Sequence, residues 1–236
     1  MEEALYLRDS YLREFDATVA KADGKFIVLD KTAFYPKSGG QLWDEGIMIR
    51  DGKEFKVVFV GKFGGAISHE VDQEGLSAGD KVHCKIDWER RYKLMRSHTA
   101  AHIISEVINR ETGAIITGNQ LDVNRCRIDF SVEEFDREKL KSYEDKANEV
   151  VNQNIDVTFE FMSREEVMKD MKMTKLSKGV EGLPDLETFR VLRIGDFDYQ
   201  ADGGTHVRNT REIGKITFID FVNKGKNNRR IYYTLS

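Results

Sequence analysis

The spacing of the apolar residues changes near Trp88, and this change constrains the fold more than any other feature of the sequence. Before Trp88, short alternating apolar segments are separated by turn signals such as Asp23-Gly24 and Asp51-Gly52, which favour β-hairpins. Several short strands joined by such turns indicate a small β-barrel. From residue 89 to about residue 111, apolar residues recur at the spacing of an α-helix instead.

The rest of the chain mixes both periodicities. The sequence predicts a helix over residues 133–151, a strand over 155–161, a short helix capped by Ser163, and strands near 189–194, 215–222 and 229–234. No internal repeat and no low-complexity linker separates the two halves. We therefore predict an α+β protein of two domains, a small β-barrel over residues 1–88 packed tightly on an α+β domain over residues 89–236.

Composition sets limits on partners and location. Charged residues make up 33% of the chain but the net charge is −4, so contact with a nucleic acid must rest on local basic patches. No apolar run is long enough for a membrane span, and the acidic N-terminus lacks the features of a signal peptide. The two cysteines, Cys84 and Cys126, are too few for a disulfide scaffold. We expect a cytoplasmic protein with reduced thiols and no membrane partner.

Two of the five histidines, His98 and His102, lie four residues apart on the predicted helix. Residues at this spacing share one face of a helix, so two imidazoles can bind one zinc ion and leave positions for further ligands. A bare pair of this kind is more often two partly exposed surface histidines. Zinc metalloproteases need a glutamate directly after the first histidine as general base, and Thr99 in that position argues against a peptidase.

A third histidine, His206, follows Asp202 at the same spacing in a segment that contains two glycines. Glycines let the backbone turn sharply and approach a ligand closely, so Asp202 and His206 are spaced to converge on one metal. Alone, this segment is equally compatible with a glycine turn that contains an incidental histidine. Together with His98 and His102 it predicts a zinc site, with three histidines as ligands.

Four segments of the chain carry a resemblance to one protein family. They are residues 32–41 (TAFYPKSGGQ), 96–102 (RSHTAAH), 125–131 (RCRIDFS), and 194–197 (IGDF) with their continuation at 203–207 (GGTHV). On these segments the chain resembles the stand-alone alanyl-tRNA editing proteins, which are relatives of the editing domain of alanyl-tRNA synthetase. The similarity runs from about residue 10 to about residue 220, and its FYPxSGGQ and GGTHV segments are specific.

The resemblance implies a trans-editing hydrolase, an aminoacyl-tRNA deacylase. Such an enzyme cleaves the ester between a wrong amino acid and tRNA(Ala), so the expected substrates are seryl- and glycyl-tRNA(Ala), with alanyl-tRNA(Ala) spared. The resemblance also implies one Zn²⁺ per chain in the second domain, which would then be the editing domain. The expected partner is the acceptor end of tRNA(Ala), and no ATP is required. The sequence indicates no oligomeric state.

Further site residues are implied by the resemblance in the first domain. Thr32 and Gln41 are expected to act in catalysis and substrate binding, with Thr32 hydrogen-bonding the serine hydroxyl and Gln41 contacting the substrate or its terminal ribose. Gly39 and Gly40 would bind substrate beside them. The alternative for Thr32 and Gln41 is a barrel turn held together by its own hydrogen bonds, and Gly39 and Gly40 fit either interpretation. For Thr32 we favour the functional interpretation, on the basis of the resemblance.

A short basic cluster precedes the histidines on the predicted helix, formed by Arg90, Arg91, Lys93 and Arg96. Such clusters are the usual contacts for tRNA phosphates, although a charged run is often only a solvated face. Within the cluster, Arg96 belongs to the RSHTAAH segment and is the candidate for substrate binding.

The chain departs from the family at one ligand, because Asp202 stands where the family usually has cysteine. Asp202 either ligates zinc directly through a carboxylate oxygen, or lies outside the ligands and orients a histidine or a water. Bound zinc could activate a water or could hold the amino group or terminal ribose of the substrate, and we favour the second role. The alternative function is a non-catalytic tRNA-binding module that has lost efficient zinc binding.

Overall fold

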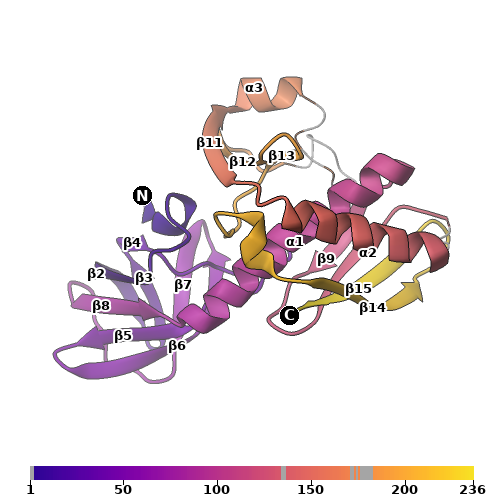
Figure 1. Ribbon diagram of the computed structural model, residues 1–236. Coiled ribbons are helices and arrows are strands. Elements are labelled where there is room, and N and C mark those ends of the chain that lie inside the picture. The colour runs from indigo at the N-terminus through magenta and orange to yellow at the C-terminus, as the bar shows by residue number, and fades with distance from the viewer. Residues whose placement is uncertain (1–2, 134–136, 171–172, 174, 176–182) are drawn as a thin grey trace. The chain divides into compact units, whose positions relative to one another are not determined.

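The structure is a computed structural model that describes residues 3–133, 137–170, 173, 175 and 183–236 (Figure 1). The chain forms two compact units, Met1–Met95 (unit 1) and Arg96–Ser236 (unit 2). The division falls inside helix α1 (Trp88–Thr112), which begins one residue before the helix predicted from the sequence. No helix among the described residues is long and apolar enough to cross a membrane.

Unit 1 is a closed barrel of six strands in the order β2-β3-β7-β6-β5-β8. The strands are β2 (Glu14–Asp23), β3 (Phe26–Leu29), β5 (Gly46–Arg50), β6 (Lys53–Phe63), β7 (Ala66–Val71) and β8 (Lys81–Ile86). Asp23 pairs with Phe26 and Arg50 pairs with Lys53, so both hairpins turn where the sequence predicts them. Two short strands, β1 (Glu3–Ala4) and β4 (Lys31–Thr32), form a separate parallel pair. The predicted small barrel is confirmed.

The barrel core forms because each strand turns alternate residues inward. In β8, Val82, Cys84 and Ile86 are buried, whereas the intervening His83 is partly exposed and lies 2.8 Å from Asp16 through its Nδ1 atom. The same alternation in the other strands gives one hydrophobic cluster inside the barrel. Burial of this apolar area is the main force that holds unit 1 together.

Arg91, in the part of α1 that belongs to unit 1, is fully buried and forms an ion pair with Asp44. Its Nε atom donates to Asp44 at 2.9 Å, and its two terminal nitrogens donate to the carbonyl oxygens of Ser10 and Ala33 at 2.8 and 2.5 Å. A buried guanidinium with these partners has no route to a phosphate. The predicted contact of Arg91 with tRNA is therefore wrong, and the residue serves the barrel instead.

Unit 2 contains two antiparallel sheets (Figure 1). One has the order β14-β15-β10-β9, with strands β9 (Ile116–Gln120), β10 (Cys126–Phe130), β14 (Ile216–Asn223) and β15 (Arg229–Leu235). The other has the order β11-β12-β13, with strands β11 (Val157–Ser163), β12 (Thr188–Ile194) and β13 (Asp198–Ala201). Among the described residues of this unit, the helices are α2 (Arg137–Asn152), α3 (Arg164–Lys169) and the short 3-10 helix η4 (Thr210–Ile213), together with the second part of α1. The α+β prediction is confirmed.

Helices α1 and α2 are joined to the four-stranded sheet by hydrogen bonds. Asn148 of α2 exchanges two hydrogen bonds with the backbone of Ile216 in β14, at 2.8 and 2.9 Å. Tyr233 of β15 donates to the carbonyl oxygen of Ser97 in α1 at 2.7 Å. Helix α2 begins at Arg137, whereas the sequence predicts a start at Glu133, which lies in a bend. Residues 134–136 lie outside the described residues.

Helix α3 follows β11 at the cap that the sequence predicts. Glu166 N donates to Ser163 Oγ at 3.3 Å, and Ser163 N donates to Glu166 Oε2 at 2.9 Å, which completes a capping box. Strand β11 begins at Val157, two residues later than the predicted strand, because the N–H group of Ile155 donates to Thr210 Oγ1 rather than to a neighbouring strand.

Candidate metal centre

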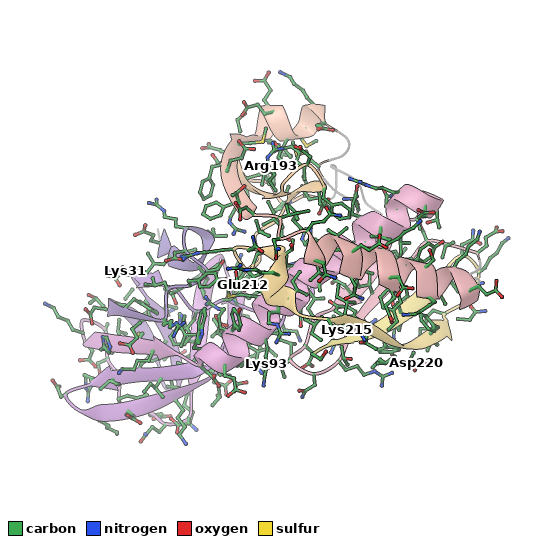
Figure 2. All side chains as sticks on the ribbon, viewed as in Figure 1. Lys31, Lys93, Arg193, Glu212, Lys215 and Asp220 are labelled. Atoms are coloured by element: carbon green, nitrogen blue, oxygen red, sulfur yellow. The ribbon has the colours of Figure 1, made fainter. Side chains whose placement is uncertain are left out.

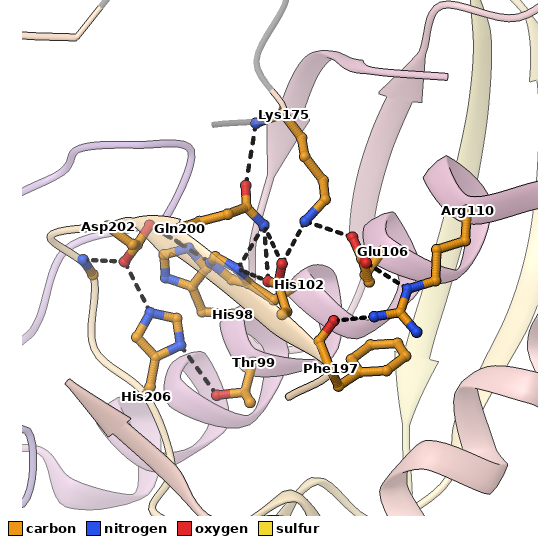
Figure 3. Close-up of polar contacts among 12 residues, drawn as sticks. His98, Thr99, His102, Glu106, Arg110, Lys175, Phe197, Gln200, Asp202 and His206 are labelled. Carbon is orange, nitrogen blue, oxygen red and sulfur yellow. Dashed lines mark hydrogen bonds and ion pairs between the residues drawn. The ribbon is translucent and has the colours of Figure 1, made fainter. Parts of the chain in front are cut away.

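The centre is built on α1 in unit 2, where His98 and His102 lie one turn apart with buried side chains and ring centroids 5.4 Å from each other. The segment after β13 carries Asp202 and His206 to the same place. The ring of His206 lies 4.4 Å from that of His98 and 5.2 Å from that of His102, between centroids (Figure 3). The structure therefore brings together the three histidines and the aspartate that the sequence singles out.

Gly204 lets this segment approach the helix closely. A Cβ atom at Gly204 would lie 2.2 Å from Cε1 of His98, far inside van der Waals contact. Asp202 N donates to the carbonyl oxygen of Arg190 in β12 at 2.9 Å, and Gly204 N donates to Asp202 Oδ1 at 2.6 Å. The segment is thus held both by its neighbouring strand and by the Asp202 carboxylate.

The Asp202 carboxylate lies among the Nε2 atoms of the three histidines. The closest oxygen–nitrogen distances are 2.9 Å to His206, 3.4 Å to His98 and 3.7 Å to His102. The four ligand atoms all lie within 4.8 Å of one another. Ligand atoms at about 2.1 Å from a tetrahedral zinc ion are roughly 3.4 Å apart, so the donor types and their spacing fit zinc.

Other side chains fix the orientation of two of the imidazoles. His102 Nδ1 lies 2.8 Å from Asp198 Oδ2, and His206 Nδ1 lies 3.2 Å from Thr99 Oγ1 (Figure 3). Metal-binding histidines commonly use their second nitrogen in this way, because the contact sets the tautomer and the ring orientation. These contacts turn both Nε2 atoms toward Asp202. Thr99, which cannot act as a general base, supports His206.

Asp198 is held in place by a polar network behind the centre. Gln200 Nε2 donates to both oxygens of Asp198, at 2.8 and 3.0 Å. Lys175 forms an ion pair with Asp198 and another with Glu106, the second at 2.6 Å. The carboxylate that orients His102 is therefore itself held by Gln200 and Lys175, and Lys175 is held in turn by Glu106 of α1.

The environment sets the protonation of the four candidate ligands. Burial lowers the pKa of His98 well below its usual value and lowers the pKa of His206 to about 4. Burial acts on His102 in the same direction, but Asp198 and Asp202 outweigh it and raise the pKa of His102 to about 9. Burial favours the neutral form of Asp202, yet the histidines outweigh it and hold the pKa of Asp202 well below its usual value. Metal ligands must be deprotonated, so a metal that bound here at neutral pH would have to displace a proton from His102, whose pKa is raised.

The predicted site residues of the FYPxSGGQ segment lie in unit 1. Thr32 is fully buried, with its Oγ1 atom 2.8 Å from His69 Nε2 and accepting a hydrogen bond from Phe34 N at 3.1 Å. Gln41 is also fully buried, and its backbone exchanges two hydrogen bonds with Ser38. Gly39 and Gly40 form the turn between Ser38 and Gln41. Their φ angles are 57° and 84°, in a backbone region that favours glycine.

Arg96 lies at the start of unit 2 and binds backbone. Its Nε and Nη2 atoms donate to the carbonyl oxygen of Ile213 at 3.0 and 2.6 Å, and Nη2 also donates to the carbonyl oxygen of Ser236 at 3.2 Å. Within the protein, Arg96 therefore connects α1 to the end of η4 and to the C-terminal residue. Its predicted role toward substrate stays a prediction.

Sequence reasoning missed two residues that shape the centre, Asp198 and Gln200, whereas the close approach at Gly204 follows the expectation for the two glycines of this segment. A signal for the two missed residues existed, because Asp198, Gln200 and Asp202 alternate in sequence and so share one face of an extended segment. Strand β13 has only four residues, so the alternation was too short to be recognised as a strand.

Comparison with known proteins first gives the class. Residues 5–90 match the family described as tRNA synthetases class II (A), and residues 189–232 match the threonyl and alanyl tRNA synthetase second additional domain. Alanine–tRNA ligase of Thermococcus kodakarensis is 40% identical over 220 residues, which cover 91% of this chain and 24% of the ligase. These matches agree with the structure, which has a barrel unit and an α+β unit with a candidate metal centre. The chain is therefore a relative of the editing region of alanyl-tRNA synthetase.

Relatives of the same length then give the family. The alanyl-tRNA editing protein AlaX-M of Methanosarcina barkeri is 50% identical over 243 residues, which cover 100% of this chain and 99% of that protein. AlaX-M of Saccharolobus solfataricus is 40% identical over 238 residues, which cover 100% of this chain and 99% of that protein. The chain belongs to the AlaX-M family of alanyl-tRNA editing proteins, as the resemblance predicts, and its function lies in proofreading during translation.

Proposed function

We propose that this protein is a zinc-dependent trans-editing hydrolase that removes serine and glycine from mischarged tRNA(Ala) and spares alanyl-tRNA(Ala). The observation that carries the proposal is the convergence of three histidine Nε2 atoms and one carboxylate in unit 2 of an editing-family chain. The partner would be the acceptor end of tRNA(Ala), and the reaction would require no ATP because ester hydrolysis is favourable in water.

In this proposal, His98, His102, His206 and Asp202 hold one Zn²⁺, with Asp202 as a direct ligand. A carboxylate oxygen is a weaker zinc ligand than the cysteine thiolate that the family usually carries at this position, so we expect a lower zinc affinity than that of a Cys-containing relative. Bound zinc would supply a Lewis acid that holds the amino group or terminal ribose of the substrate. Asp198 and Thr99 keep His102 and His206 aimed at the centre.

Thr32 is the proposed reader of the serine side chain. His69 Nδ1 lies 2.9 Å from the carbonyl oxygen of Ile27, so Nδ1 carries the ring proton and Nε2 accepts the proton of the Thr32 hydroxyl. Burial lowers the pKa of His69 to about 4, which keeps the ring neutral at physiological pH. With its proton directed at His69 and one lone pair accepting from Phe34 N, the Thr32 oxygen would have one lone pair left for a serine hydroxyl, which alanine cannot donate. Because Thr32 is fully buried, the substrate would have to displace the residues that cover it.

Gly39, Gly40, Gln41 and Arg96 complete the proposed substrate contacts. The two glycines would let the backbone approach the terminal nucleotide closely, and Gln41 would contact the substrate or its ribose. Arg96 would contribute a positive charge close to the ligands on α1. The proposed editing domain would begin at residue 89, near the start of α1, and would thus include the first turns of this helix, which belong to unit 1.

The test measures release of serine from seryl-tRNA(Ala), beside glycyl- and alanyl-tRNA(Ala), with and without a zinc chelator. Chelator-sensitive release of serine and glycine, with alanine retained, is the expected result. An absence of release in the presence of added zinc, with tRNA binding retained, would favour the non-catalytic tRNA-binding module that the Asp202 substitution suggests.

A further inference from the structure

Strand β11 exposes two neighbouring aromatic rings. The side chains of Phe159 and Phe161 are 38% and 51% exposed, and their ring centroids are 5.9 Å apart in an edge-to-face arrangement. Single exposed apolar side chains are common on protein surfaces, whereas adjacent large ones often mark a contact surface. Strand β11 is also one of the two edge strands of its sheet, and β13 is the other.

The two rings lie on the sheet face that supports the metal centre. Phe161 pairs with Arg190, Phe159 pairs with Leu192, and Leu192 in turn pairs with Gln200 of β13. Paired residues of antiparallel strands project to the same face of a sheet. The face that carries the exposed rings on β11 is therefore the face that carries Gln200, and with it Asp198, on β13.

Arg190 connects the rings to the metal centre directly. Its guanidinium carbon lies 4.4 Å from the ring centroid of Phe159. The Nη1 atom of the same side chain donates to the carbonyl oxygens of Gly204 and Asp202, at 2.9 and 3.2 Å. One buried side chain thus touches both the aromatic surface and the segment that carries two candidate ligands.

The charge of this face suits a polyanion. By strand alternation, Arg190 is the one charged residue of β11 and β12 on the face with the two rings. Glu160 and Arg193 project from the opposite face, where they form an ion pair at 3.3 Å (Arg193 is labelled in Figure 2). A phosphodiester chain that crosses β12 toward β11 therefore meets no carboxylate on these two strands, and the buried Arg190 adds a positive charge beneath this face without contacting the phosphates directly.

We propose, on the basis of the function proposed above, that Phe159 and Phe161 form a stacking surface for the unpaired nucleotides at the 3′ end of the tRNA. The amino acid is esterified to the terminal ribose, so the last bases must lie close to the site of cleavage. Unpaired bases stack on exposed aromatic side chains, and this contact is independent of sequence because every base has a flat face. In this proposal, the 3′ end of the RNA passes from the metal centre over Arg190 to the two aromatic rings.

The test uses an RNA hairpin that mimics the acceptor stem, with 2-aminopurine replacing the last or the second-last base of its unpaired 3′ end. We expect the protein to quench the fluorescence of the probe. Phe159→Ala and Phe161→Ala should lose the quenching and weaken binding by roughly 5- to 150-fold for each stacked base that is lost.

Matched variants separate stacking from a general apolar contact. Phe161→Tyr keeps a ring and should behave like the parent protein, whereas Phe161→Leu keeps an apolar side chain and should behave like Phe161→Ala. Phe221→Ala removes another phenylalanine of unit 2, which is 41% exposed on β14, and should change nothing. Absent quenching with the parent protein overturns the proposal, as does equal quenching by all variants.

Serine release from seryl-tRNA(Ala) by the same variants keeps the two proposals apart. Normal release by the parent protein and by both alanine variants leaves the editing function standing and overturns the stacking surface. Quenching that depends on the two rings, without serine release by the parent protein, overturns the editing function alone. A dimer that dissociates in the Phe159→Ala/Phe161→Ala double variant, with RNA binding unchanged, assigns the surface to a second copy of the chain and overturns our proposal.

Discussion

At the scale of single residues, the metal centre depends as much on the groups behind the histidines as on the histidines themselves. His102 points its Nε2 atom inward because Asp198 holds its Nδ1 atom, and Gln200 holds Asp198 in turn. Residue type also decides the character of the candidate centre, because Asp202 offers a carboxylate oxygen beside three imidazole nitrogens. A carboxylate oxygen and a cysteine sulfur differ in zinc affinity, but either can occupy one corner of a tetrahedral site.

Asp198→Asn should weaken zinc binding by about 10- to 100-fold, because an amide cannot match the charged contact that orients His102. The measurement is zinc content after dialysis against a series of buffered zinc concentrations. Asp196→Asn, at an exposed position in the turn just before β13, is the control and should bind zinc like the parent protein. Equal zinc affinity in the two variants would contradict a role for Asp198.

Thr32→Val should lower kcat/KM for seryl-tRNA(Ala) by about tenfold and leave glycyl-tRNA(Ala) hydrolysis nearly unchanged, because glycine has no hydroxyl to be read. Thr32→Ser keeps the hydroxyl and should retain seryl activity. The valine variant also leaves His69 Nε2 without its donor, which should cost about 1–3 kcal/mol of unfolding free energy. Equal loss on the two substrates would show that Thr32 only stabilises the barrel.

At the scale of elements, the centre exists because one helix face meets one short strand and the segment that follows it. The i, i+4 spacing on α1 fixes the relation between His98 and His102, since both project from one face of the helix. The placement of Asp202 and His206 depends instead on β13 pairing with β12 and on the close approach of Gly204 to His98.

Gly204→Ala should abolish most zinc binding while the protein stays folded, because the new Cβ atom would occupy the position of the His98 ring. Zinc content and circular dichroism together measure this outcome. Gly118→Ala on β9 is the matched control, since its Cβ atom would approach Asp129 Oδ2 no closer than 3.3 Å. Zinc retained by the Gly204 variant at the parent level would mean that the segment can move aside at little cost.

At the scale of the whole molecule, the chain is organised as two units whose stabilities rest on different features. Unit 1 is a closed barrel whose core contains the Arg91–Asp44 ion pair, whereas unit 2 packs helices on an antiparallel sheet and holds the candidate metal centre. Removal of one partner from a buried ion pair leaves a charge without compensation in a low dielectric, which is far more costly than loss of an exposed pair.

Arg91→Met should therefore lower the unfolding free energy of unit 1 by about 3–5 kcal/mol, because Asp44 would remain buried and charged. Lys93→Met, two residues further along α1, removes an exposed ion pair with Glu89 and is the control, with a much smaller expected effect. Urea denaturation followed through fluorescence measures both. Similar midpoints for the two variants would contradict the structural role of Arg91.

The sequence by itself determined the elements with a strong periodicity and the residues with a distinctive chemistry. The hairpins of unit 1, helix α1, the Ser163 cap and the long strands of unit 2 all follow from local spacing and turn residues. Strands β9 and β13 could not be predicted from local spacing. Strand β9 (Ile116–Gln120) contains one apolar residue, and strand β13 (Asp198–Ala201) has only four residues. Such segments become strands through pairing with a neighbour, which no local pattern records.

Only the tertiary structure decided which polar residues serve which purpose. In the sequence, Arg91 and Arg96 cannot be distinguished from phosphate-binding arginines. In the structure, Arg91 is buried against Asp44, and Arg96 binds the carbonyl oxygens of Ile213 and Ser236. The candidate metal site could be predicted from the sequence because histidine is rare in this chain and its helical spacing is informative. The residues that orient His102 and His206 are distant from them in the sequence. Only the packing of whole helices and strands brings such residues together.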